Sequence, residues 1–251
     1  MAQQKGIFPM KGSIGNITFY KTKDGFLARE KGSLNADRIA NDPSFQRTRE
    51  NGAEFGRAGT AGKVLRAALR SLLQNTADGR SIARLTKEMM RVIQADALNA
   101  RGMRNVIDGE AELLEGFEFN VNSKLGTTLF APFTARIDRV SGALSVNIPS
   151  FVPVSMVVAP SGTTHFKIVS AGVEIDFENE AYQSQFHSTN ELEWNAAATA
   201  IIDLVNNVTA NSAHPLFLAL GIAFYQQVNT TMYPLKNGAF NSLALVKVSG
   251  H

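Results

Sequence analysis

The chain of 251 residues contains no cysteine and a single tryptophan. The lack of cysteine excludes disulfide bonds and thiolate metal sites, and it fits either a reducing compartment or the exterior of a particle. Long apolar runs are also missing. Residues 1–9 lack the apolar core of a secretory signal, and the most apolar stretch, 215–225, is too short to cross a bilayer as a helix. We therefore expect no secretory signal and no membrane span, and we interpret 215–225 as a buried strand.

Motifs of catalysis and cofactor binding are missing as well. The sequence has no G-x-S-x-G elbow, no H-E-x-x-H pair and no dinucleotide fingerprint. Residues 56–64 fall short of a phosphate loop, because five residues instead of four separate Gly56 from Gly62 and Val64 stands at the Ser/Thr position. The four histidines are scattered: His165, His187, His214 and His251. We expect no enzyme activity, no cofactor and no metal site.

The distribution of charge is the most informative feature that is present. Residues 1–107 hold 19 Lys and Arg against 9 Asp and Glu, whereas residues 108–251 hold 6 against 13, within a whole-chain charge of +3. Such asymmetry indicates either an anionic partner for the basic part or attraction between unlike parts of neighbouring copies.

Residues 12–31 predict a β-hairpin, with apolar residues on both sides of a turn that contains Asp24-Gly25. An isolated hairpin is marginally stable in water, so this one has to pack on another surface. We expect Ile17, Phe19 and Phe26 to make that contact. Residues 31–41 are predicted to be a linker with one short helical turn.

A helix is predicted from Asp42-Pro43, a cap followed by a proline at the first helical position, to about residue 75. Gly52, Gly56 and Gly59 fall on one face of it. Each glycine costs about 1 kcal/mol of helix propensity. Three interpretations are possible: close packing against this face, which lacks side chains, a break into two helices near Gly59, or a ligand that approaches the backbone.

A second helix is predicted over residues 80–99, with one apolar face and one basic face. The basic residues form two rows on successive helices: Lys63, Arg66 and Arg70 on the first, and Arg80, Arg84, Lys87 and Arg91 on the second. No aromatic residue lies between Phe55 and Phe117, so platforms for stacking single-stranded bases are absent from this region. The rows could bind phosphates without sequence specificity or pair with acidic protein surfaces.

From residue 117 onward, short apolar runs alternate with Gly, Pro, Asn and Ser, which predicts an antiparallel sandwich. The expected strands cover residues 117–121, 127–131, 134–140, 143–148, 164–169, 173–178, 181–187, 199–205, 216–228 and 243–248. The fold class is therefore α+β. We divide the chain into an N-terminal arm and hairpin (1–41), a basic helical region (42–115) and an acidic β-domain (116–251).

Three carboxylates alternate along one predicted strand: Glu174, Asp176 and Glu178. Alternation places them on one face of the strand, opposite Val173, Ile175 and Phe177. A solvated outer face explains this row, and the other readings are an interface with a basic partner, a calcium site or an acid–base pair.

Five strings near the two ends of the chain carry a resemblance that extends over most of it: 12–32 (GSIGNITFYKTKDGFLAREKG), 45–51 (FQRTREN), 54–63 (EFGRAGTAGK), 220–229 (LGIAFYQQVN) and 232–248 (MYPLKNGAFNSLALVKV). In these strings the sequence resembles an uncharacterised protein family of Bacteroidetes-type genomes. The resemblance implies a helical N-terminal part and an immunoglobulin-like or fibronectin-like sandwich. It implies no activity and no catalytic residue.

These features together favour a structural or assembly subunit that binds copies of itself or other assembly proteins through heterologous contacts, as in a filament, a phage particle or a phage-like device. A cytoplasmic assembly and a virion or particle are both compatible with it. The alternative is a nucleic-acid or polyanion binder that uses the basic helices. A carbohydrate-binding sandwich is a third hypothesis, which the small number of aromatic residues weakens.

Overall fold

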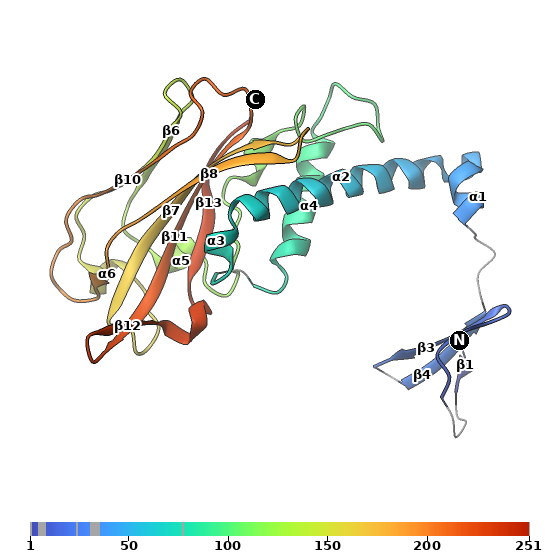
Figure 1. Cartoon of the computed structure of the whole chain (residues 1–251), viewed down its shortest axis with the longest axis horizontal. Coiled ribbons are helices and arrows are strands. Elements are labelled where there is room, and N and C mark those ends of the chain that lie inside the picture. Colours follow the sequence, from blue (N-terminus) through green and yellow to red (C-terminus); the bar gives the residue numbers. More distant parts are fainter. Residues whose placement is uncertain (1, 5–8, 24, 31–35, 77, 251) are drawn as a thin grey trace. The chain divides into compact units, whose positions relative to one another are not determined.

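The computed structural model describes residues 2–4, 9–23, 25–30, 36–76 and 78–250. The chain divides into two compact units, Met1–Arg49 and Glu50–His251. Each unit is considered by itself below, and both contain helix and antiparallel sheet, so the α+β class is confirmed (Figure 1).

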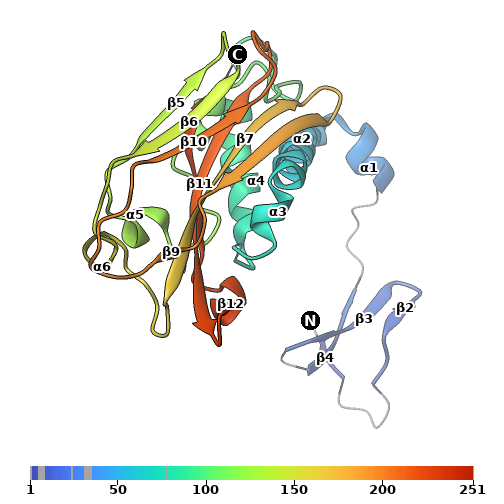
Figure 2. The same cartoon turned by 60° about the vertical axis from the view of Figure 1, so that its left-hand side comes forward.

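The N-terminal unit is built on a four-stranded antiparallel sheet with the order β1-β4-β3-β2. Figure 2 labels β2, β3 and β4 of this sheet. Its strands are β1 (Ala2–Gln3), β2 (Gly12–Ile14), β3 (Ile17–Thr22) and β4 (Gly25–Glu30). The predicted hairpin is confirmed, because β3 and β4 pair from Ile17 opposite Glu30 to Thr22 opposite Gly25. Asp24 of the expected turn lies outside the described residues. The two short outer strands were not predicted.

The segment between this sheet and the long helix contains α1 (Ala36–Asn41); the first part of the predicted linker, 31–35, lies outside the described residues. The predicted cap is confirmed, since the side chain of Asp42 accepts a hydrogen bond from the Ser44 amide and Pro43 follows it. A short 3-10 helix, Pro43–Phe45, comes first, and α2 begins at Gln46.

Helix α2 (Gln46–Ala68) runs without a break through its glycines. The chain leaves the helix at Leu69 and continues into the short α3 (Arg70–Leu73). Of the three interpretations of the glycines, the break into two helices near Gly59 is therefore wrong. Helix α4 (Ser81–Gln94) follows and ends five residues before the predicted end at 99.

Two antiparallel sheets form the rest of the second unit and curl toward each other into a half-barrel (Figure 2). The larger sheet comprises β7 (His165–Asp176), β8 (Ala181–Ser188), β9 (Leu192–Glu193), β11 (Leu216–Val228), β12 (Thr231–Pro234) and β13 (Ser242–Ser249). The smaller sheet comprises β5 (Thr134–Asp138), β6 (Ala143–Ile148) and β10 (Ile202–Asn207). Short helices lie in the connections: Ala111–Leu114, α5 (Leu125–Thr128), α6 (Pro153–Met156) and Leu235–Gly238.

Two hydrophobic cores lie on opposite sides of the larger sheet. One core joins α2 and α4 to the sheet through residues such as Leu65, Met89 and Phe217. The other fills the space between the two sheets with residues such as Val146, Phe166 and Leu218. Because helices and sheet share a core, the division expected at 115/116 does not separate two compact units; the structure divides at 49/50 instead.

Several strand predictions are confirmed, and those for β8 and β13 differ from the observed bounds by at most one residue at either end. Residues 216–228 and 143–148 form strands with the predicted bounds, and 215–225 is buried as expected. The segments 164–169 and 173–178 belong to one strand, β7. The strands expected at 117–121 and 127–131 were wrong, since these segments contain only isolated bridges and part of α5. The immunoglobulin-like or fibronectin-like sandwich is not confirmed.

Two buried carboxylates order the loop that follows α4: Glu54 holds it against α2, and Asp96 binds groups within the loop. Glu54 accepts two hydrogen bonds from the guanidinium of Arg104, at 2.8 and 2.9 Å, and a third from the amide of Gly102. Asp96 accepts hydrogen bonds from the amides of Leu98, Asn99 and Asn105. Burial by itself would raise the pKa of Asp96, but these hydrogen bonds outweigh it and lower the pKa from 3.8 to about 2.

A carboxylate whose pKa is depressed by folding stabilises the protein above its unfolded pKa, and this stabilisation is lost as the pH falls through the folded value. We therefore expect Asp96 to contribute to a loss of stability between about pH 4 and pH 2. The variant Asp96→Asn should have a lower Tm at pH 7 and a shallower fall of Tm across this window, measured by circular dichroism. Identical slopes for the variant and the parent protein would contradict this assignment.

Candidate functional site

The N-terminal sheet has no core of its own in the part of the chain that the structure describes. Of the described residues between 2 and 49, none is buried. Ile14 and Ile17 are 62% and 45% exposed, although both are large and apolar. The sheet therefore offers apolar surface that the described residues of its own unit leave exposed, which is typical of a contact surface.

The pairing register collects the apolar side chains on one side of this sheet. Residues directly opposite each other on neighbouring strands share a face. The pairs Ile14–Ile17, Phe19–Ala28 and Lys21–Phe26 therefore lie on one face, together with Ala2 and Glu30. We call these eight residues the apolar face: Ala2, Ile14, Ile17, Phe19, Lys21, Phe26, Ala28 and Glu30. The three expected contact residues, Ile17, Phe19 and Phe26, are thus brought together.

The other side of the sheet is more polar. It carries Gln3, Ser13, Thr18, Tyr20, Leu27 and Arg29. Two cation–π contacts agree with this assignment of faces: the Lys21 ammonium lies 5.5 Å from the centre of the Phe26 ring, and the Arg29 guanidinium lies 5.5 Å from that of Tyr20. Each contact joins residues of one face.

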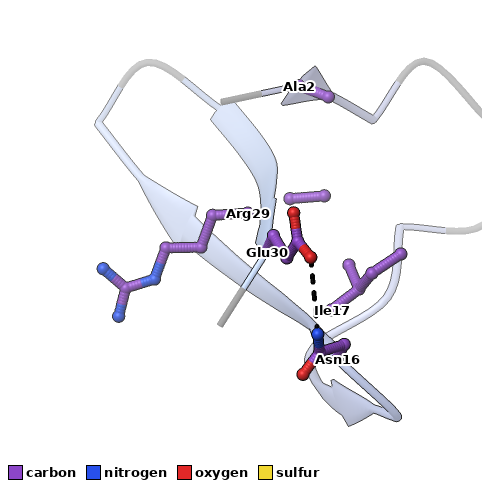
Figure 3. Close-up of a pocket in the computed structure, with 6 residues that line it drawn as sticks. Ala2, Asn16, Ile17, Arg29 and Glu30 are labelled. Carbon is purple, nitrogen blue, oxygen red and sulfur yellow. Dashed lines mark hydrogen bonds between the residues drawn. The ribbon is translucent and has the colours of Figure 1, made fainter. Parts of the chain in front are cut away.

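The apolar face is charged at its two ends. Lys21 lies near the β3–β4 turn, and Glu30 lies at the far end of β4, opposite Ile17. Glu30 accepts a hydrogen bond of 3.4 Å from the side-chain amide of Asn16, which is a neutral donor (Figure 3). A hollow of about 770 Å³ opens at this end, lined by Ala2, Asn16, Ile17, Ala28, Arg29 and Glu30. The hollow is wide enough to accept a side chain from another surface.

The second basic row is interrupted at Arg84, which the sequence placed in solvent. Its guanidinium donates hydrogen bonds to the carbonyl oxygens of Glu118 and Phe119 and pairs with Asp78 at 2.6 Å. It also lies over the Phe117 ring at 5.2 Å. Arg84 therefore anchors the 117–119 segment to α4, and its expected role as an interaction residue was wrong.

The other cations of the two rows remain on the surface, and some of them are paired. Lys63 lies 3.7 Å from Glu180, and Arg91 lies 2.6 Å from Glu88. Arg80 and Lys87 are exposed. Lys63, Arg66 and Arg70 line one groove of about 450 Å³. Arg84, Lys87 and Arg91 line another of about 410 Å³, but Glu88, Glu115 and Glu118 line it too and offset their charge.

The glycine face of α2 is open. A Cβ added at Gly52, Gly56 or Gly59 would meet no atom within 4 Å, so the expected close packing against these three positions was wrong. The neighbouring Gly62 does pack, against Leu85 and Met89 of α4. Gly52 and Gly56 line an open groove of about 430 Å³ with Phe177 and Glu180 among its other residues.

The expected row of three carboxylates is not a single face. Glu174 is buried, and it accepts hydrogen bonds from the Ser212 hydroxyl at 2.6 Å and the Thr209 amide at 3.1 Å. Burial by itself would raise the pKa of Glu174, but these bonds outweigh it and lower the pKa. Asp176 caps the turn after β7, where it binds the amides of Glu178 and Asn179. Only Glu178 is exposed, so the solvated face expected from the sequence was wrong.

The sequence reasoning missed several members of the apolar face, namely Ala2, Ile14, Lys21, Ala28 and Glu30. The signal for most of them was present. Once the turn fixes the register of β3 and β4, alternation assigns Lys21, Ala28 and Glu30 to the same side as Phe19 and Phe26. Ala2 and Ile14 depend on the two short outer strands, which have no clear pattern in the sequence.

Comparison of the chain with protein-family models, with curated proteins and with solved structures finds no match. Within the described part of the chain, no group of three or more His, Asp or Glu side chains could hold a metal ion. None of its helices is both long and apolar enough to cross a membrane. The candidate site therefore rests on the geometry of the apolar face and of the groove lined by Lys63, Arg66 and Arg70.

The two neighbouring arginines Arg80 and Arg84 should respond differently to neutralisation. Arg84→Gln loses charged hydrogen bonds to buried carbonyl groups, and we expect it to lower the free energy of unfolding by about 2–3 kcal/mol. Arg80→Gln changes an exposed side chain and should stay within about 0.5 kcal/mol of the parent protein. Urea denaturation followed by tryptophan fluorescence measures both. Equal stability of the two variants would show that Arg84 is not an anchor.

Proposed function

We propose that this chain is a structural subunit that self-associates or docks on partner proteins, and that the N-terminal sheet is its docking element. The observation that carries the proposal is the apolar face on a sheet that has no buried residue among those described. Filaments, phage particles and phage-like devices are the settings that we propose for it.

The physical argument is the stability of a small sheet. Sheets gain independent stability by burying one hydrophobic face against another layer. Small units without a core use disulfides, metals or association instead. The chain has no cysteine, and no metal-binding group occurs among its described residues. Burial against a protein surface is the remaining source of stability, and it supports a role in assembly.

The charges would then act on encounter and register more than on affinity. Arg70, Arg80 and Lys87 are exposed cations of the helical layer. Exposed carboxylates such as Glu178 and Asp203 lie in the β-sheet part of the same unit. A contact between these different surfaces of neighbouring copies would be heterologous, which leads to rings or open filaments.

The finer description of the two facing sheets as an immunoglobulin-like or fibronectin-like sandwich also stays a proposal. What supports it is that two antiparallel sheets enclose one core. Such a module would serve the assembly as a rigid platform, since a hydrophobic core packs against each side of the larger sheet.

If the apolar face drives assembly, substitutions at the adjacent residues Phe26 and Leu27 of β4 should have different effects on association. Phe26 belongs to the apolar face and Leu27 to the opposite side. Burial of a phenylalanine contributes about 1.5–3 kcal/mol, so Phe26→Ser should weaken association about tenfold or more. Leu27→Ser, the matched control, should associate like the parent chain. Sedimentation velocity across a range of concentrations measures this, and monomers of the parent chain at every concentration and salt would refute self-association.

The groove lined by Lys63, Arg66 and Arg70 favours a second candidate function, the binding of a polyanion. Three cations along one groove are complementary to the negative charge of a phosphate backbone, and Asp78, the carboxylate that also lines the groove, is paired with Arg84. The groove includes no aromatic residue for stacking. Duplex nucleic acid without sequence preference would be the ligand.

Titration with unspecific duplex DNA separates this candidate from assembly. A polyanion binder should bind at low salt and lose affinity steeply as salt rises. Binding releases the counterions condensed on the DNA, and a higher salt concentration opposes that release. The double variant Arg66→Gln/Arg70→Gln should then bind weakly at every salt concentration, while Arg136→Gln, exposed on the smaller sheet, should not change binding. The absence of binding by the parent chain at low salt would exclude the candidate.

A further inference from the structure

The apolar face has the features of a surface that pairs with itself. It is one side of a sheet, and a second sheet stacked on it would supply the layer that it lacks. Its apolar residues lie in the middle and its two charges, Lys21 and Glu30, lie at opposite ends and have opposite signs. A face of this kind is complementary to its own copy after a half-turn.

We infer that the apolar faces of two copies stack on each other about a two-fold axis and form a sandwich of two four-stranded sheets. This inference rests on the proposed function, and it names a second copy of the same sheet as the partner. The half-turn reverses the strand direction, so that the Lys21 end of one sheet lies over the Glu30 end of the other. Each dimer then contains the contact between Lys21 and Glu30 twice, as an isologous interface requires.

The pairs within each sheet fit this arrangement. Phe19 and Ala28 lie opposite each other in the middle row of the face. A large and a small residue side by side give an uneven surface, and such surfaces interdigitate when two sheets pack about 10 Å apart. The hollow at the Ile17–Glu30 end offers space in which Phe26 of the second copy would fit. Both charges can reach solvent at the rim, which avoids the cost of burying them.

The size of the face determines how tightly two copies bind. The sheet has two six-residue strands and two shorter ones of two and three residues. At a rise of about 3.3 Å per residue and a spacing of about 4.8 Å, they give a face of roughly 300 Å² per copy. The roughly 600 Å² buried in total is about half of what stable interfaces bury. The isolated contact is therefore weak, and the experiment has to trap it.

The absence of cysteine makes thiol cross-linking specific, because a single introduced thiol has no competitor. Backbones of sheets packed about 10 Å apart are too distant for a disulfide, so a short bismaleimide is the cross-linker. Ala28→Cys places a thiol in the middle of the apolar face, close to the expected axis, and Thr18→Cys places one on the opposite side of the same sheet. With the bismaleimide at high protein concentration, Ala28→Cys should form a covalent dimer at least about tenfold faster than Thr18→Cys, because only the thiols of Ala28→Cys face each other in the dimer. Tryptophan fluorescence of Trp194 checks that the second unit stays folded in both variants.

Reversal of the two charges tests the two-fold axis. Lys21→Glu alone and Glu30→Lys alone each place like charges at both symmetric contacts and should weaken dimer formation about tenfold. The double variant Lys21→Glu/Glu30→Lys restores opposite charges and should dimerise like the parent chain. Its recovery also shows that the single variants failed through repulsion and not through loss of the sheet.

The outcomes distinguish this inference from the proposed function. Larger assemblies that form without a cross-link at Ala28→Cys would overturn the paired sheets and leave assembly in place. Equal cross-linking of Ala28→Cys and Thr18→Cys would overturn the choice of face. A chain that stays monomeric at every concentration, with no cross-link at either position, would overturn both the pairing and self-association. A double charge variant that stays as weak as the single ones would overturn the two-fold arrangement.

Discussion

The burial of β11 on both of its faces is the constraint on which the second unit depends. This strand pairs with β7 along ten residues on one side and with β13 and β12 on the other, so its backbone polar groups are satisfied by neighbouring strands. Its side chains alternate between two cores: Phe217 faces the helices, and Leu218 faces the smaller sheet. Gly221 permits close approach, since a Cβ there would lie 2.4 Å from the Ser242 carbonyl oxygen. Strand β11 therefore packs against the helices on one side and against the smaller sheet on the other.

The two units of the chain differ in how far their apolar side chains are covered. The second unit has apolar layers on both sides of its central sheet and uses part of its charge internally, as Lys63–Glu180 and Lys247–Glu115 show. The asymmetry of charge along the sequence is therefore partly a property of how helices meet strands within one unit. The N-terminal sheet has exposed apolar residues instead, and its own strands offer no second layer to cover them.

The sequence predicted features that depend on local pattern. The hairpin of β3 and β4 follows from its turn and flanking apolar residues, and β11 follows from a long apolar run. It misassigned features that depend on which layers cover an element. Alternation places Glu174 on one side of β7, but only the fold shows that the 209–212 loop covers that side with hydrogen-bond donors. Arg84 fits a solvated helix face by spacing, yet the 117–119 segment brings two carbonyl groups to it. Helical spacing likewise cannot show that the Gly56 side of α2 has no neighbour.

In the proposed dimer, the positions of Lys21 and Glu30 at opposite ends of one small face limit the number of subunits that this face can join to two. A face that matches only its own copy is saturated once two subunits have met, so by itself it links subunits in pairs and cannot extend a chain. Under the proposed function, growth beyond the pair would require a second contact on the larger unit, where exposed cations and carboxylates are available. Two weak contacts of different symmetry would make growth strongly dependent on concentration, because each subunit is held firmly only when both are occupied.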